Sequence, residues 1–179
     1  MTALHDMTAG ELLANYKTKK LSPVEAVDAV IAHIEKWEPR LKALYAPDFG
    51  GARQAAKASE KRWQAGKPQG SLDGVPITIK ENIATKGVPV PLGTAATDLV
   101  PATDDAPAAA RVREAGAVIL AKTTMPDYGM LSSGRSSFHP LTRNPWNLAW
   151  NPGGSSAGAG AAAAAGSNNH AGRAWRARP

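Results

Sequence analysis

The sequence predicts an α/β fold in which N-terminal helices precede part of a mixed or parallel sheet with flanking helices. Two helix-start signatures lie within the first 25 of the 179 residues. Two apolar segments rich in β-branched residues follow, and a helical segment separates them. The order strand, helix, strand is typical of a parallel sheet that is covered by helices.

The first two predicted helices begin at capping boxes, Thr8-Ala9-Gly10-Glu11 and Ser22-Pro23-Val24-Glu25. In this motif the hydroxyl and the carboxylate each bond to the other residue's backbone N–H. In the second helix, apolar residues recur at steps of three and four: Val24, Val27, Val30, Ile31 and Ile34. We expect this helix to end at Pro39 and a third, solvated surface helix to cover residues 51–65.

The strand segments come next. Leu72-Asp73-Gly74 predicts a turn, and residues 75–80 alternate apolar and other side chains as a strand does. A helix is expected from Pro107 to Gly116, and the short apolar run over residues 117–121 is typical of a buried parallel strand.

The last part of the chain changes texture twice. Residues 151–160 are mostly glycine, serine and alanine, and residues 155–165 are expected to form a helix whose N-terminal amides help to place the loop before it. After Gly166 no apolar periodicity of either kind remains. We therefore divide the chain into an ordered portion, 1–166, and an unpatterned tail, 167–179, which we expect to be disordered.

Charge and cysteine content exclude several functions. The formal net charge of +6 comes from 21 basic and 15 acidic residues, but Arg173, Arg176 and Arg178 supply half of it within the tail. A nucleic-acid surface is disfavoured because no basic stripe or interleaved aromatic pattern occurs. The absence of cysteine excludes disulfides, Cys-ligated zinc and thiol catalysis. Without a signal peptide or a long apolar run, we expect a cytoplasmic protein that does not enter the membrane.

Two interpretations of the glycine-serine segment are disfavoured by its position. Residues 158–163 match the glycine turn of dinucleotide-binding folds, but no strand precedes them and the last acidic residue of the chain is Asp127. Residues 154–158 match the nucleophile elbow of α/β-hydrolases, which needs an acid and then a histidine later in the chain. No acid follows, and the one later histidine is His170 in the tail.

A third interpretation uses a lysine as the base. A serine hydroxyl needs a proton acceptor, and a lysine amine can serve where burial favours its neutral form. Lys80 ends an apolar strand, which is a setting that can provide such burial. His139 is interpreted as a polar loop residue. Trp146 and Trp150 are expected to pack along the approach to the glycine-serine loop, with the lining of a pocket as the alternative.

Four blocks of the sequence, in this order, resemble the amidase signature family: residues 72–82 (LDGVPITIKEN), 116–123 (GAVILAKT), 125–129 (MPDYG) and 143–156 (RNPWNLAWNPGGSS). The resemblance implies a catalytic relay of a lysine, a serine that follows a cis peptide bond, and a nucleophilic serine. It assigns the lysine to Lys80 and the cis-serine to Ser155. It also implies hydrolysis of a small-molecule carboxamide through an acyl-enzyme, with no metal ion and no organic cofactor.

The chain departs from the family pattern after Gly166. The family's nucleophilic serine lies in a Gly-Gly-Ser turn that also forms the oxyanion hole, and its expected place falls near Pro179, where no such turn occurs. We therefore expect a truncation or frameshift near residue 166 and an inactive chain. Two alternatives stay open: a fragment of the amidase component of a tRNA-dependent amidotransferase, which would meet nucleic acid only indirectly, and a non-catalytic binding module.

Overall fold

The computed structural model describes residues 3–166 of the chain. Residues 1–2 and the tail of residues 167–179, which we expect to be disordered, lie outside the described residues.

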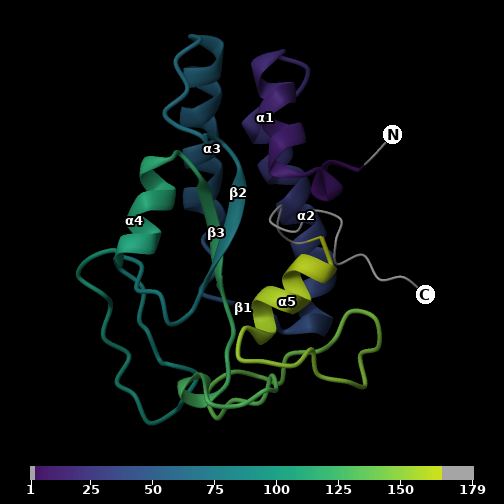
Figure 1. Cartoon of the computed structure of the whole chain (residues 1–179), viewed down its shortest axis with the longest axis vertical. Coiled ribbons are helices and arrows are strands. Elements are labelled where there is room, and N and C mark those ends of the chain that lie inside the picture. The colour runs from purple at the N-terminus through teal and green to yellow at the C-terminus, as the bar shows by residue number, and fades with distance from the viewer. Residues whose placement is uncertain (1–2, 167–179) are drawn as a thin grey trace.

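A three-stranded mixed sheet lies at the centre of the described fold (Figure 1). Its order is β1 (Leu44–Tyr45), β3 (Val118–Thr123) and β2 (Pro76–Lys80). Strands β2 and β3 run parallel, with a register irregularity between Ile77 and Thr78, and β1 pairs antiparallel to β3. The predicted α/β class and the mixed character of the sheet are thus confirmed.

Helices surround this sheet (Figure 1). In chain order the helical elements are η1 (Leu4–Asp6), α1 (Ala9–Lys17), α2 (Pro23–Leu41), α3 (Phe49–Gln64), α4 (Pro107–Glu114), η2 (Asp127–Gly129) and α5 (Ala157–Ala164). The crossover from β2 to β3 passes through α4, as the strand, helix, strand pattern predicts.

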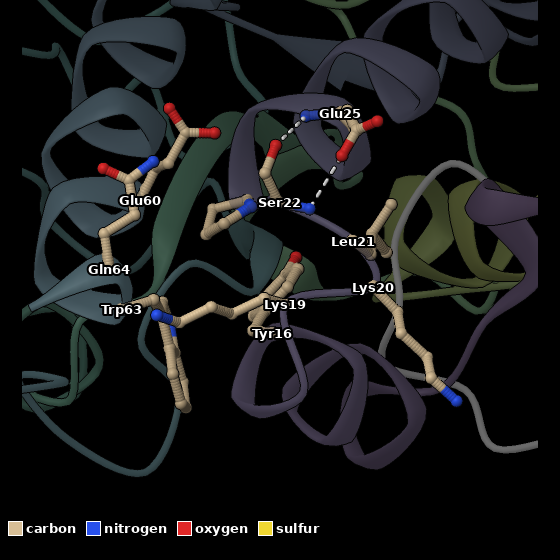
Figure 2. A pocket seen from close by; sticks show the side chains of 10 residues that line it. Tyr16, Lys19, Lys20, Leu21, Ser22, Glu25, Glu60, Trp63 and Gln64 are labelled. Carbon is tan, nitrogen blue, oxygen red and sulfur yellow. Dashed lines mark hydrogen bonds between the residues drawn. The ribbon is translucent and has the colours of Figure 1, made fainter. Parts of the chain in front are cut away.

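The predicted capping boxes start α1 and α2, and Figure 2 shows the box at α2. The Glu25 backbone N–H donates to Ser22 Oγ at 3.2 Å, and the Ser22 N–H donates to a Glu25 carboxylate oxygen at 2.8 Å. The predicted end at Pro39 is wrong, because α2 continues to Leu41. Pro39 cannot donate to the carbonyl four residues earlier, but Leu41 is buried against α5 and the helix continues to it. The helix ends when Lys42 turns into the left-handed region.

The two faces of the sheet enter different apolar clusters. Val118 and Leu120 of β3 pack with α2 and α3, while Ile77 and Ile79 of β2 pack beside α4. The helix α3, predicted to be solvated, buries one narrow face through Ala52 and other small residues. Because side chains alternate along a strand, consecutive residues at the end of β2 point to opposite faces of the sheet.

A buried carboxylate fixes the turn that enters β2. Asp73 has no exposed surface, and it accepts hydrogen bonds from the Arg62 guanidinium and from the Gln69 backbone N–H. The Trp63 indole N–H donates to the Asp73 carbonyl at 3.1 Å. Burial alone raises the pKa of Asp73, but these hydrogen bonds outweigh burial and hold the pKa below its ordinary value of 3.8.

We expect this carboxylate to make folding stability depend on acid pH. Because its pKa is lowered in the folded state, its contribution is fully present above pH 3.8 and is lost as pH falls through the lower, folded value. Asp73→Asn should remove that dependence and lower the free energy of unfolding at pH 7 by about 2 kcal/mol or more. Urea unfolding curves from pH 7 to pH 2 measure both effects.

Asp28→Asn is the matched control, because Asp28 pairs with Arg53 on the surface, where the two side chains are 48% and 45% exposed. An exposed pair contributes less than about 1 kcal/mol. Equal losses in the two variants would contradict the role assigned to Asp73.

Candidate functional site

Lys80, the last residue of β2, contacts Ser155, which lies 75 positions later in the chain. Ile79 packs into the cluster beside α4, so strand alternation directs Lys80 to the other face of the sheet, where α5 lies (Figure 1). The Lys80 Nζ donates a hydrogen bond to the Ser155 Oγ at 2.9 Å. The two residues assigned by resemblance are 75 positions apart in sequence, and the fold brings them into direct contact.

Ser155 lies in a turn that leaves no room for a side chain at position 154. The Gly154–Ser155 peptide bond is cis, and Gly153 has a positive φ of 87°. A Cβ at Gly154 would lie 2.5–2.6 Å from backbone atoms of Leu131 and Ser133. Glycine at position 154 therefore allows the segment around residues 131–133 to lie directly against the turn that presents Ser155.

The helix that follows Ser155 is anchored to the sheet. Helix α5 begins at Ala157, within the predicted range of 155–165, and Ser156 is its N-cap residue. The Gly158 backbone N–H donates to the Thr124 carbonyl at 3.0 Å. A Cβ at Gly158 would collide with the Ala43 carbonyl oxygen and with Thr124. This close approach holds the start of α5, and with it Ser155, at the end of the sheet.

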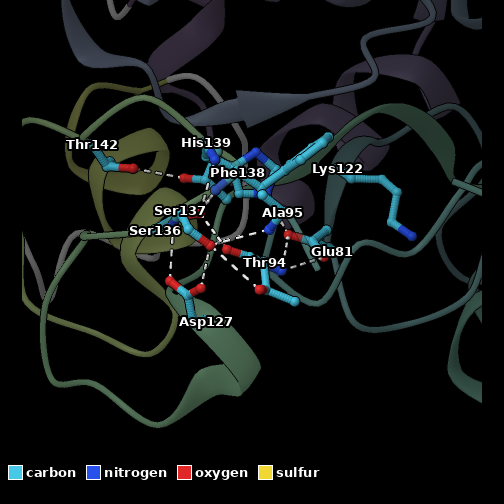
Figure 3. A network of polar contacts seen from close by, with 12 residues as sticks. Glu81, Thr94, Ala95, Lys122, Asp127, Ser136, Ser137, Phe138, His139 and Thr142 are labelled. Atoms are coloured by element: carbon cyan, nitrogen blue, oxygen red, sulfur yellow. Dashed lines mark hydrogen bonds and ion pairs between the residues drawn. The ribbon is translucent and has the colours of Figure 1, made fainter. Parts of the chain in front are cut away.

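A buried polar network lies beside this pair (Figure 3). Glu81 has no exposed surface, and its two carboxylate oxygens accept from the Gly93 backbone N–H at 3.0 and 3.1 Å. One of them also bonds to His139 Nε2. An ionised Glu81 can only accept in this bond, which requires the histidine form that carries a proton on Nε2. His139 does lie in a loop, as expected, but it is only 7% exposed and its ring bonds to a buried carboxylate.

The network continues toward the segment that follows β3. The Ser136 Oγ donates to the Gly93 carbonyl, and Ser137 donates to Asp127 through its hydroxyl and, at 2.9 Å, through its backbone N–H (Figure 3). The hydrogen bonds from Ser137 lower the pKa of Asp127. Serines 136 and 137 therefore fasten two loops, around residues 93 and 127, to the segment that leads to Ser155.

Lys122 is a second lysine near Glu81. It is 2% exposed, and its Nζ donates to the Ile83 carbonyl at 2.9 Å. Burial lowers the pKa of Lys122 to about 8, although the charge of Glu81 acts in the opposite direction. Lys122 therefore holds the backbone at Ile83, three residues after Lys80.

Two tryptophans and the Glu81–His139 pair differ from what the sequence predicts. Trp146 and Trp150 are 62% and 66% exposed, so they do not pack closely along the approach to the loop. Trp146 instead lines a surface pocket, which is the alternative prediction. Glu81 and His139 are separated by 58 positions, and no spacing rule links them. The available signal was the position of Glu81, which directly follows Lys80 at the end of an apolar strand.

A cavity of about 330 Å³ lies elsewhere, between the ends of α1, α2 and α3 (Figure 2). Tyr16 and Trp63 form its apolar part, and Lys19, Glu25 and Glu60 give it charges of both signs. Neither Lys80 nor Ser155 lines this cavity.

Within residues 3–166, no group of three or more potential ligands could hold a metal ion. Among the same residues, none of the helices is both long and apolar enough to cross a membrane.

Comparison with known proteins points to one family. The family model described as Amidase matches residues 25–171. The chain is 41% identical over 156 residues to a component of the glutamyl-tRNA(Gln) amidotransferase of Geobacter metallireducens, covering 87% of this chain and 32% of that protein. It is 39% identical over 159 residues to the corresponding protein of Roseiflexus sp., covering 89% of this chain and 32% of the relative. The chain thus spans about a third of the length of these relatives.

Solved structures agree. A bacterial aryl acylamidase of the amidase signature enzymes superposes with a TM-score of 0.84 at 34% identity, over 93% of this chain and 35% of that one. The peptide amidase of Stenotrophomonas maltophilia gives 0.83 at 28% identity, over 90% and 34% of the two chains. A fatty acid amide hydrolase gives 0.89 at 26% identity, over 93% and 30%.

The family model covers most of the chain, and the structural matches extend over nearly all of it. The four sequence blocks, the α/β fold and these matches agree, and the chain belongs to the amidase signature family.

Proposed function

We propose that Lys80 and Ser155 are two members of the proton relay of an amide-cleaving enzyme. The observation that carries the proposal is the hydrogen bond of 2.9 Å between the Lys80 amine and the Ser155 hydroxyl. In the proposed step, the neutral amine of Lys80 accepts the Ser155 proton while Ser155 accepts the proton of a nucleophilic hydroxyl. The nucleophile's oxygen bonds to the carboxamide carbon, and the C–N bond breaks as the returned proton leaves with the amine product. Water then hydrolyses the acyl-enzyme and restores the hydroxyl.

The reaction also needs a nucleophilic hydroxyl and donors for the oxyanion, and the Lys80–Ser155 pair supplies neither. The sequence contains Gly-Gly-Ser once, at residues 153–155, where the serine is already engaged by Lys80. A relay acts as a unit, and a missing nucleophile or oxyanion donor removes most of the rate.

A chimera tests the relay. Residues 1–166 replace the corresponding part of the Geobacter metallireducens relative, which supplies the other two thirds of the protein. We expect Lys80→Ala and Ser155→Ala each to lower kcat for amide hydrolysis by about 10³-fold or more, because relay members fail together. Ammonia release is the readout.

Lys57→Ala is the control for this experiment, because Lys57 is exposed on α3 and should leave kcat unchanged. An active chimera that is indifferent to Lys80→Ala would refute the proposed role.

For the 179-residue chain alone, we expect no carboxamide hydrolysis above background. The reason is that no second Gly-Gly-Ser turn supplies a nucleophile and oxyanion donors. Purified chain is incubated with simple carboxamides, and ammonia is measured. Turnover that disappears in Lys80→Ala would show that the chain carries a complete site.

A finer proposal is that the parent enzyme is the amidase component of a tRNA-dependent amidotransferase. It is supported by the names of the relatives, which are 36–41% identical to this chain. Such a component releases ammonia for transfer to an acylated tRNA that its partner proteins hold, which would place it in the cytoplasm. A free-standing amidase is the other candidate, supported by the structural match to the aryl acylamidase.

Co-expression distinguishes these two candidates. The chimera described above is produced together with the other components of the Geobacter metallireducens amidotransferase, and the mixture is separated by size-exclusion chromatography. An amidotransferase component should elute in a complex with its partners, whereas a free-standing amidase should elute alone. The unmodified relative serves as the positive control.

A further inference from the structure

We propose that Glu81 and His139 are positioning residues whose buried hydrogen bond keeps Lys80 and Ser155 in contact. The bond links β2, which carries Lys80, to the segment that leads to Ser155. The relevance of this inference to catalysis rests on the proposed function, but the inference itself concerns geometry.

Glu81 fixes the position of Lys80 through the backbone. It directly follows Lys80, and its backbone N–H donates to the Thr123 carbonyl at 3.0 Å, which extends the pairing of β2 with β3. Its carboxylate is held by the Gly93 N–H and by His139. With main chain and side chain both fixed, the backbone at Lys80 has little freedom to turn away from Ser155.

His139 fixes the other side of the pair. Its backbone N–H donates to Ser136 Oγ at 2.8 Å, and its ring lies edge-on to Tyr45 and Phe138. Three residues later, Thr142 bonds to Thr124 at 2.7 Å. The segment that leads to Ser155 is therefore attached to the sheet at two residues, His139 at the end of β2 and Thr142 at the end of β3.

Burial makes the Glu81–His139 bond hard to replace. Both side chains are almost fully excluded from water, at 0% and 4% exposed. The neighbouring cation, Lys122, already donates to the Ile83 carbonyl. Without the His139 donor, the carboxylate would keep the Gly93 N–H and lose its ring partner, and a buried charge with too few hydrogen bonds drives local rearrangement.

The test is an NMR measurement on the full 179-residue chain labelled with ¹³C-lysine. The position of the Lys80 Cε resonance reports on the Lys80–Ser155 contact, and Ser155→Ala gives its position when that contact is lost. We expect His139→Leu to move the resonance most of the way to the Ser155→Ala position. His139→Gln, which retains a side-chain N–H donor, should leave it near the wild-type position.

A double variant separates positioning from general destabilisation. In the Ser155→Ala background, His139→Leu should cause no further movement of the Lys80 resonance, because the contact through which it acts is already absent. A purely structural role would lower the melting temperature and leave the Lys80 resonance of the folded protein in place. That result overturns the proposal.

If His139→Leu does not fold, His139→Phe decides the question. It removes the ring nitrogen that bonds to Glu81 and keeps an aromatic ring beside Tyr45 and Phe138. Movement of the Lys80 resonance toward the Ser155→Ala position supports the proposal, and an unmoved resonance overturns it. Because NMR measures a contact and not turnover, failure of the amidase assay would leave this inference standing.

Discussion

The close approach of α5 to the sheet is the constraint on which the site depends. The Gly158 N–H donates to the Thr124 carbonyl at 3.0 Å, and the Thr124 N–H in turn donates to the Ala43 carbonyl at 2.9 Å. These bonds join α5, the end of β3 and the segment before β1 in one line. A side chain at position 158 would collide with this line. Since Ser155 lies three residues before Gly158, the same contact holds its hydroxyl beside Lys80.

Two buried carboxylates bracket β2 and give the strand its fixed position. Asp73 lies before the strand and Glu81 after it, and both have no exposed surface. Each accepts a backbone N–H, and each has one nitrogen side chain as partner, Arg62 for Asp73 and His139 for Glu81. A buried carboxylate is tolerated only with such partners. Asp73 therefore ties the start of β2 to α3 through Arg62, and Glu81 ties the end of β2 to the remote loop that contains His139. The precision of the Lys80 position follows from this arrangement.

Two solved structures of the family share the region that this chain covers. A fatty acid amide hydrolase and a peptide amidase differ in the amides that their names describe, yet both superpose on most of this chain with TM-scores of 0.89 and 0.83. The region that they share with it contains the strand that ends in Lys80 and the turn that presents Ser155. Enzymes whose names describe different amides therefore share the fold of this region.

Through resemblance, the sequence proposes Lys80 and Ser155 as relay residues. By itself it determined the α/β class, the two capped helices and the parallel strands. These features depend on local spacing, because capping, periodicity and alternation act within a few residues. The strand β1, only two residues long, is too short to show alternation, and α2 continues through Pro39 because tertiary packing outweighs a local stop signal. Only the tertiary structure decided the Glu81–His139 pair and the contact of Lys80 with Ser155. Such contacts join positions 58 and 75 residues apart, and their formation depends on how the sheet and α5 pack, which no local pattern encodes.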